Sequence, residues 1–210
     1  MAIAITRRRV LGLAAAAAAA GAMPALAAPE AVAANAAALY DDPDAPVGGN
    51  PDGDVTLVEF FDYRCGACKA VAPTITRLLA EDGNIRLVYK EWPIIGHFSR
   101  SAAEAALAAD RLGRYVPLHE ALMGHPGLPY PGKVMELAES VGVAPDVLKR
   151  TMAAEAPRIA AAIERNLDLA RRLALPGTPA FVIGGEIVLG SKDLASLKRL
   201  VDDARRKTIG

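Results

Sequence analysis

Residues 54–92 determine the class of fold that this chain can adopt. The segment DVTLVEFFDY, residues 54–63, is a nearly continuous apolar run, which is typical of a strand buried on both faces of a sheet. Apolar side chains then recur at helical spacing from Gly66 to Leu79, and NIRLVYKEW, residues 84–92, has the pattern of a second strand. A strand, a helix and a strand in this order form a crossover unit with two parallel strands. The sequence therefore predicts an α/β fold.

The only two cysteines, Cys65 and Cys68, lie where the first strand meets the helix. A thiolate attacks disulfides and a thiol scarcely does, and the free N–H groups and positive dipole end of a helix favour an anion. Cys65 is predicted at that helix end, where a thiolate is favoured. Cys68 lies one turn deeper, close enough to form a disulfide with Cys65 and to act as the resolving thiol. The pair predicts redox chemistry.

Two other roles for the cysteines remain open. A zinc site needs about four ligands, and only His97, His119 and His125 could supplement the pair. None of these histidines has a helical partner at the right spacing. A purely structural disulfide is the second alternative, but a bridge that closes so small a loop constrains the unfolded chain little. Both alternatives are less favoured, and we expect neither a metal nor a cofactor.

Residues 1–27 have the features of a secretory signal: three arginines at 7–9, an apolar run from Val10 to about Ala22, and a small-residue cleavage pattern ending at Ala27. An uncleaved anchor is a less favoured alternative, and TRRRVL also resembles the twin-arginine export consensus, so both export routes stay open. Without these residues 21 basic and 24 acidic side chains remain, a formal charge of −3, and no basic patch suggests nucleic acid. The sequence predicts a periplasmic protein.

Composition divides the remaining chain into four parts. Residues 28–50 form an alanine-rich, then turn-rich arm, for which a helix is expected over 30–39. Residues 51–97 hold the strand–helix–strand unit, and residues 174–210 hold a hairpin around Gly184-Gly185 and a closing helix. Between them, residues 98–173 show only helical patterns, over 99–112, 116–123, 133–141 and 145–173, the last broken by Pro157. We interpret this part as an all-helical insertion.

This order resembles the DsbA family of thioredoxin-fold thiol:disulfide oxidoreductases. The residues that carry the resemblance are FFDY before Cys65-Gly66-Ala67-Cys68, the intervening helices, and Gly177-Thr178-Pro179 before the hairpin. It covers nearly the whole chain after residue 27. The resemblance implies a thioredoxin fold interrupted by an all-helical insertion. It also implies exported proteins with reduced cysteines as substrates, and a quinone-linked membrane protein that re-oxidises the cysteine pair.

The resemblance also assigns roles to residues outside the cysteine pair. It implies that Pro179 is cis and lies beside the cysteines, and that the backbone of Thr178 is available to a substrate strand. It implies that Glu59 relays a proton to or from the deeper thiol. A structural ion pair is an equally favoured role for Glu59, with Lys90 as the possible partner, because a buried carboxylate without a partner is costly.

Residues next to the cysteines receive simpler interpretations. Asp62, Tyr63 and Arg64 are expected to shape the rim of the site, and Lys69 is expected to be a solvated helix residue. Trp92, the only tryptophan, is expected to pack in the core or a loop rather than to contact substrate.

The dipeptide Gly66-Ala67 lacks the Pro-His of the family's strongest oxidases, so no imidazolium adds to the helix field at Cys65. The oxidase direction is favoured, and a periplasmic reductase or isomerase is the alternative. An isomerase commonly needs an oligomerisation arm, for which residues 28–46 are short. A non-redox relative of the glutathione-transferase kappa type is a third class, but those proteins typically carry serine at the position of Cys65.

Overall fold

The predicted strand–helix–strand unit forms the centre of the structure. The computed structural model describes residues 28–209, and the predicted secretory signal over residues 1–27 lies outside the described residues. Strands β2 (Val55–Phe61) and β3 (Ile85–Glu91) are parallel, as the crossover requires. They are joined by helix α3 (Gly66–Asp82).

Helix α3 begins and ends where its sequence dictates. Cys65 is the N-cap residue, with an extended backbone, so the cysteine pair occupies the first turn. At the other end Gly83 adopts the left-handed conformation, with φ of 72°, and its N–H donates to the carbonyl of Leu79. Glycine takes this conformation without the steric cost that a β-carbon adds. The two ends fix the helix so that its N-terminus lies at the carboxyl end of β2.

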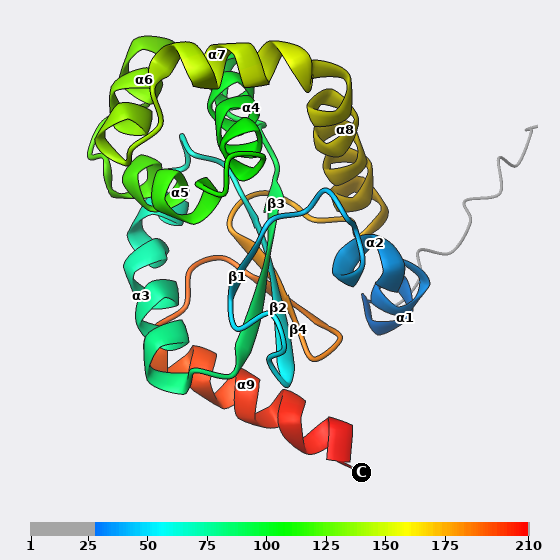
Figure 1. Ribbon diagram of the computed structural model, residues 1–210. Helices are drawn as coiled ribbons and strands as arrows, with labels where there is room; N and C mark the ends of the chain where they lie inside the picture. Colours follow the sequence, from blue (N-terminus) through cyan, green and yellow to red (C-terminus); the bar gives the residue numbers. More distant parts are fainter. Residues whose placement is uncertain (1–27, 210) are drawn as a thin grey trace, which may run out of the picture.

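The sheet described for residues 28–209 has five strands in the order β1-β3-β2-β4-β5 (Figure 1). Strand β4 (Ala180–Ile183) runs antiparallel to β2 and continues through a tight turn at Gly184-Gly185 into β5 (Glu186–Leu189). The hairpin was predicted. Strand β1 (Val47–Gly49), antiparallel to β3, was not, because three residues with two glycines give no periodic signal.

Five helices lie between β3 and β4 and together form the helical insertion (Figure 1). They are α4 (His97–Asp110), α5 (Tyr115–Gly124), α6 (Pro131–Ser140), α7 (Pro145–Ala154) and α8 (Ala156–Arg172). Pro157 separates α7 from α8 and lies in the first turn of α8, where its missing N–H costs no hydrogen bond. Helix α4 contacts all four others, and its many buried alanines allow this close approach.

The described chain begins and ends on the thioredoxin-like part. Helices α1 (Ala28–Ala34) and α2 (Ala36–Tyr40) replace the single helix predicted for the arm, with Asn35 between them. Helix α9 (Leu194–Ile209) closes the chain and packs against α3, β2 and β4. Within the described residues no helix is both long and apolar enough to cross a membrane.

Both faces of the central strands are covered, which explains their continuous apolar sequence. Leu57 and Phe61 of β2 point toward the layer that contains α3, α9 and the core of the insertion. Val58 and Phe60 point to the other face, where they pack with α1, α2 and the C-terminal part of α8. Trp92 belongs to this second cluster and makes an edge-to-face contact with Phe60, so it packs in the core as expected.

Candidate active site

Cys65 combines limited exposure with one hydrogen bond that its sulfur accepts and one that its thiol donates. Its sulfur accepts the backbone N–H of Cys68 at 3.3 Å, and its thiol donates to the carbonyl oxygen of Thr178 at 3.4 Å. Gly66 and Ala67, which follow it, are exposed. A backbone N–H that donates to sulfur stabilises the anion more than the thiol. The turn therefore presents Cys65 to a partner that approaches from solvent.

Cys68 is the more deeply buried thiol. Its side chain is fully buried, whereas Cys65 keeps 6% of its surface exposed, and both are free thiols in the structure. Burial raises the pKa of the Cys68 thiol well above its usual range, and the neighbouring Cys65 adds to the rise. The backbone of Asp62 and the side chain of Thr178 oppose part of it. Cys68 is held as a neutral thiol, which suits a resolving rather than an attacking group.

The loop before β4 closes the site from the other side of the cysteine pair. The peptide bond between Thr178 and Pro179 is cis, as the resemblance implies, and the Thr178 carbonyl faces Cys65. The Pro179 carbonyl accepts the N–H of Gly190, and the hydroxyl of Ser191 donates to the carbonyl of Ala67. The structure thus joins Cys65, Thr178 and Pro179 across more than a hundred residues of sequence.

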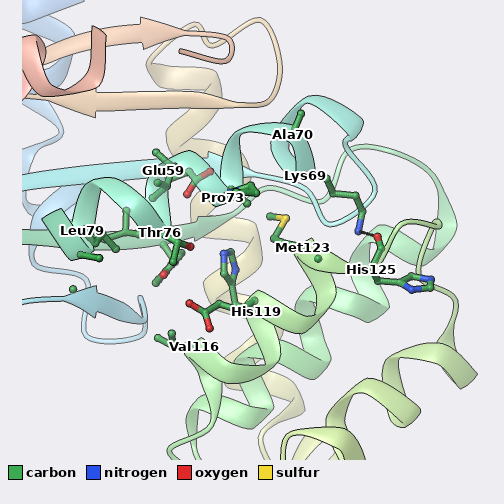
Figure 2. A pocket seen from close by; sticks show the side chains of 18 of the residues that line it. Glu59, Lys69, Ala70, Pro73, Thr76, Leu79, Val116, His119, Met123 and His125 are labelled. Carbon is green, nitrogen blue, oxygen red and sulfur yellow. Dashed lines mark hydrogen bonds between the residues drawn. The ribbon is translucent and has the colours of Figure 1, made fainter. Parts of the chain in front are cut away.

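A groove of about 980 Å³ runs along α3 from the cysteine turn (Figure 2). Apolar side chains of α3, α5 and β3 form most of its wall, and Glu59 and His119 extend into it. Burial raises the pKa of Glu59 to about 8 and lowers that of His119 to about 3, so both side chains are uncharged at neutral pH. The groove therefore holds a protonated carboxyl group on the same side of the sheet as α3.

The ion pair proposed between Glu59 and Lys90 is wrong. In the parallel register Glu59 lies opposite Tyr89, and Lys90 lies opposite Phe60. Because side chains alternate between the two faces, Lys90 points away from Glu59. Its ammonium group instead pairs with Asp42 of the arm at 3.0 Å. The Glu59 carboxyl has no hydrogen-bond or ion-pair partner among residues 28–209, and its other role, as a proton relay, stays a prediction.

Asp62 and Tyr63 are buried and do not form the rim of the site. The Asp62 carboxylate accepts three backbone N–H groups, from Arg64, Ile94 and Ile95, each at 2.8 Å. The contact with Arg64 is an Asx-type turn that a sequence can suggest, but the contacts with Ile94 and Ile95 join residues 32 and 33 positions apart. Tyr63 shares a hydrogen bond with Nδ1 of His119 in α5. Both residues connect the cysteine turn to distant segments.

Lys69 is also not the solvated residue that the sequence suggests. Its Nζ donates to the carbonyl oxygens of Leu122 at 2.5 Å and His125 at 2.9 Å, which lie at the end of α5 (Figure 2). The sequence contains no local signal for this contact, because the two acceptors are backbone groups more than fifty residues away. Nowhere in the described chain do three or more His, Cys, Asp or Glu side chains gather as metal ligands would.

The arrangement defines a class of protein. A buried and a more accessible thiol in the first turn of a helix, beside a cis-proline loop on a mixed sheet, form the redox site of thioredoxin-fold oxidoreductases. Residues 56–202 match the DSBA-like thioredoxin domain, and the chain belongs to this family.

Solved structures show the same fold and the same class. A thioredoxin-like oxidoreductase from Silicibacter pomeroyi DSS-3 is 45% identical, with a TM-score of 0.77, and the match covers 81% of this chain and 97% of that one. The thiol-disulfide exchange protein alpha-DsbA2 from Wolbachia pipientis is 30% identical, with a TM-score of 0.80 and coverage of 84% and 95%. A periplasmic thioredoxin-like protein from Salmonella enterica serovar Typhimurium is 29% identical, with a TM-score of 0.74 and coverage of 81% and 95%.

Curated relatives include proteins of different total length. Disulfide bond formation protein D from Bacillus subtilis is 27% identical over an alignment of 172 positions, which covers 75% of each chain. A protein named Na(+)/H(+) antiporter NhaA 1 from Salinispora arenicola is 31% identical over 166 residues, 78% of this chain. The chain spans about a quarter of the length of that antiporter relative. The matched part is therefore a small share of the antiporter.

Proposed function

We propose that the protein is a periplasmic oxidase that transfers its Cys65–Cys68 disulfide to exported proteins with reduced cysteines. The observation that carries this proposal is the asymmetry of the two thiols. Cys65 lies at a helix N-terminus and accepts an N–H, whereas Cys68 is buried with a raised pKa. In the transfer a client thiolate attacks Cys65, Cys68 leaves and gains a proton, and a second client thiol releases Cys65 as a thiolate.

The cellular location and partners are part of the proposal. Residues 1–27 have the pattern of a secretory signal, and one similar solved structure is described as periplasmic. The name of the Bacillus subtilis relative refers to disulfide bond formation, which supports the oxidase direction. The transfer leaves a reduced cysteine pair, so turnover requires an acceptor of two electrons, and we propose a membrane protein in this role.

The direction of exchange is tested by the relative stability of the two redox forms. If the helix N-terminus stabilises the Cys65 thiolate, the reduced folded protein gains an interaction that the disulfide form cannot make. The disulfide is then easier to reduce than one in an unfolded chain. We expect reduced protein to unfold at a higher denaturant concentration than oxidised protein at pH 7, and the measured potential against glutathione to agree, with ~30 mV for each ~1.4 kcal/mol.

The alternative is a periplasmic reductase or isomerase, which is favoured by one observation, the absence of a charged side chain in Gly66-Ala67. An oxidised form that is the more stable one at pH 7 would establish this direction. The isomerase reading also needs an oligomerisation arm. In the structure Val32 and Leu39 of the arm are buried against the same chain. Native mass, measured on the full mature chain, tests this part separately.

A further inference from the structure

A fixed cationic group lies one helical turn from Cys65. The backbone N–H of Lys69 donates to the carbonyl of Cys65 at 3.0 Å, so Lys69 lies one turn along the helix that Cys65 caps. The Lys69 ammonium is held by the carbonyls of Leu122 and His125. The end of α5 supplies these free acceptors and the negative end of its dipole, so the position of the charge is fixed by backbone.

The positive charge of Lys69 is not neutralised by a nearby carboxylate. Within the described residues no carboxylate lies within ion-pair distance of its Nζ, in contrast to Arg77 on the same helix, which pairs with Glu81. Glu59 lines the same groove, but burial raises its pKa to about 8, so it is neutral at pH 7. Glu120 lies on the exposed rim of the groove. Burial lowers the pKa of Lys69, and the nearby Cys68 sulfur opposes this shift.

We propose that Lys69 is a positioning residue of the redox site, whose fixed ammonium group stabilises the Cys65 thiolate in the place of a charged side chain within Gly66-Ala67. The inference rests on Cys65 and Cys68 being the redox pair, and it holds for either direction of exchange. A half-buried charge acts more strongly on a neighbouring anion than the same charge in bulk solvent. The helical insertion thus contributes to the redox site through the backbone of α5.

Only one redox form carries the anion on which Lys69 acts. When two glutathione molecules reduce the protein, the Cys65–Cys68 bond breaks and the bond of oxidised glutathione forms. Two electrons pass to the protein. One of the two glutathione protons goes to Cys68, and the other goes to solvent in the reduced form whose Cys65 is a thiolate. Removal of the Lys69 charge therefore disfavours the reduced form and leaves the disulfide form unaffected electrostatically.

The test compares Lys69→Met, which removes the charge and keeps most of the apolar stem, with Lys69→Arg, which keeps the charge. Arg77→Met on the same helix is the matched control. The measured quantity is the equilibrium constant for reduction of the full mature chain by glutathione at pH 7. We expect Lys69→Met to shift this constant about tenfold toward the disulfide, which corresponds to about 30 mV. We expect Lys69→Arg and Arg77→Met to stay within about twofold of the wild type.

A purely structural role gives a different result. In that case Lys69→Met lowers the unfolding midpoints of the oxidised and reduced forms equally and leaves the glutathione constant unchanged, which overturns the inference. If Lys69→Met does not fold, Lys69→Gln, which retains a donor for the α5 carbonyls, replaces it with the same expected shift. A wild-type protein without a reversible dithiol–disulfide equilibrium would refute the proposed function itself. An unchanged constant in Lys69→Met beside an active wild type refutes only the role of Lys69.

Discussion

Among single residues, the difference in burial between the two sulfurs assigns their roles in exchange. Cys65 is the thiol that a client can reach, and Cys68 is enclosed behind it. We expect Cys65→Ser to abolish oxidation of a reduced client peptide, because the Cys65–Cys68 disulfide that the client thiolate attacks cannot form. We expect Cys68→Ala to accumulate mixed disulfides between Cys65 and exported proteins, because the resolving thiol that displaces the client from Cys65 is missing. Non-reducing gels of the two variants check this, and trapping by Cys65→Ser alone would reverse the assignment.

Two buried carboxyl groups allow the role of Glu59 to be isolated. Burial raises the pKa of both Glu59 and Glu91 to about 8, but only Glu59 lies in the groove beside α3. Glu91 instead accepts a hydrogen bond from Tyr115. If Glu59 exchanges a proton with Cys68, Glu59→Gln slows client release about 10²-fold at pH 7, the lower end of general acid–base effects. Glu91→Gln, the matched control, leaves this rate unchanged in stopped-flow measurements.

The same pair of variants has a stability signature with a defined sign. Each of these carboxyl groups keeps its proton to about pH 8 in the folded protein but loses it near pH 4.3 in the unfolded chain. Between these two pH values the protein therefore takes up a proton when it folds. The contribution of this group to the free energy of unfolding is fully present below pH 4.3 and is lost as the pH rises through 8. Across this pH window, the free energy of unfolding of each glutamine variant should rise relative to that of the wild type by about 1.4 kcal/mol per pH unit. A pH-independent difference in urea unfolding would contradict the buried acid.

The sequence predicts these residues unevenly, for a physical reason. The Cys65–Cys68 pair and the helix N-terminus are local features, and their spacing alone places them. Whether Glu59 can pair with Lys90 depends on the register between β2 and β3, because the register determines the face on which Lys90 lies. No local sequence pattern indicates this register. The contacts of Lys69 end on backbone carbonyls of α5, and backbone acceptors have no sequence signature.

Among the elements, the turn after β2 and the loop after β3 are joined by the carboxylate of Asp62. Two of its three N–H donors belong to Ile94 and Ile95, so its loss frees both segments. We expect Asp62→Ala to cost about 1–3 kcal/mol, because buried donors lose their acceptor. Asp62→Asn should cost less, since one amide oxygen still accepts. Urea unfolding measures the loss of stability in each variant. Faster amide hydrogen exchange at Ile94 and Ile95 should accompany this loss. Unchanged amide exchange at Ile94 and Ile95 would show that contacts other than those with Asp62 hold this loop.

The elements themselves follow closely from sequence where they are long. Strands β2 and β3, helix α3 and the final hairpin have strong periodicity or turn signals, and the structure contains each of them. The break at Pro157 falls where proline chemistry requires it. Strand β1 escapes prediction because it exists only through its pairing with β3, and the arm divides at Asn35, whose side chain bonds back to the carbonyl of Ala31. Tertiary contacts decide such short elements.

Across the whole molecule, the arm connects the sheet to the helical insertion through two aspartates. Asp42 pairs with the fully buried Lys90 of β3 and with Arg165 of α8. Asp44 pairs with Arg165 as well and with Arg111 at the end of α4. Burial alone would raise the pKa of Asp42, but Lys90 and the N–H of Asp44 outweigh it and lower the pKa below its usual value. One short segment thus holds three parts of the fold by charge.

Removal of the Asp42 charge tests this connection. Asp42→Asn leaves the Lys90 ammonium in the core without its carboxylate, and breaking a buried pair in this way costs about 3–5 kcal/mol. Asp41→Asn, an exposed neighbour without an ion pair among the described contacts, should change stability by less than about 0.5 kcal/mol. Stability from a carboxylate with a lowered pKa is present above the unfolded value of about 3.9 and is lost as pH falls. The difference in free energy of unfolding between the wild type and Asp42→Asn, measured in urea, should therefore decrease below pH 4.

The double variant Asp42→Asn with Lys90→Met separates the burial of an unpaired charge from the loss of the arm contact. If the cost of Asp42→Asn comes from the uncompensated ammonium, methionine at position 90 restores most of the lost stability, since it fills the same space without a charge. If the cost comes from detachment of the arm, the double variant stays as unstable as the single one. The second result would mean that Arg165 and the arm contacts, rather than the Lys90 charge, make Asp42 necessary.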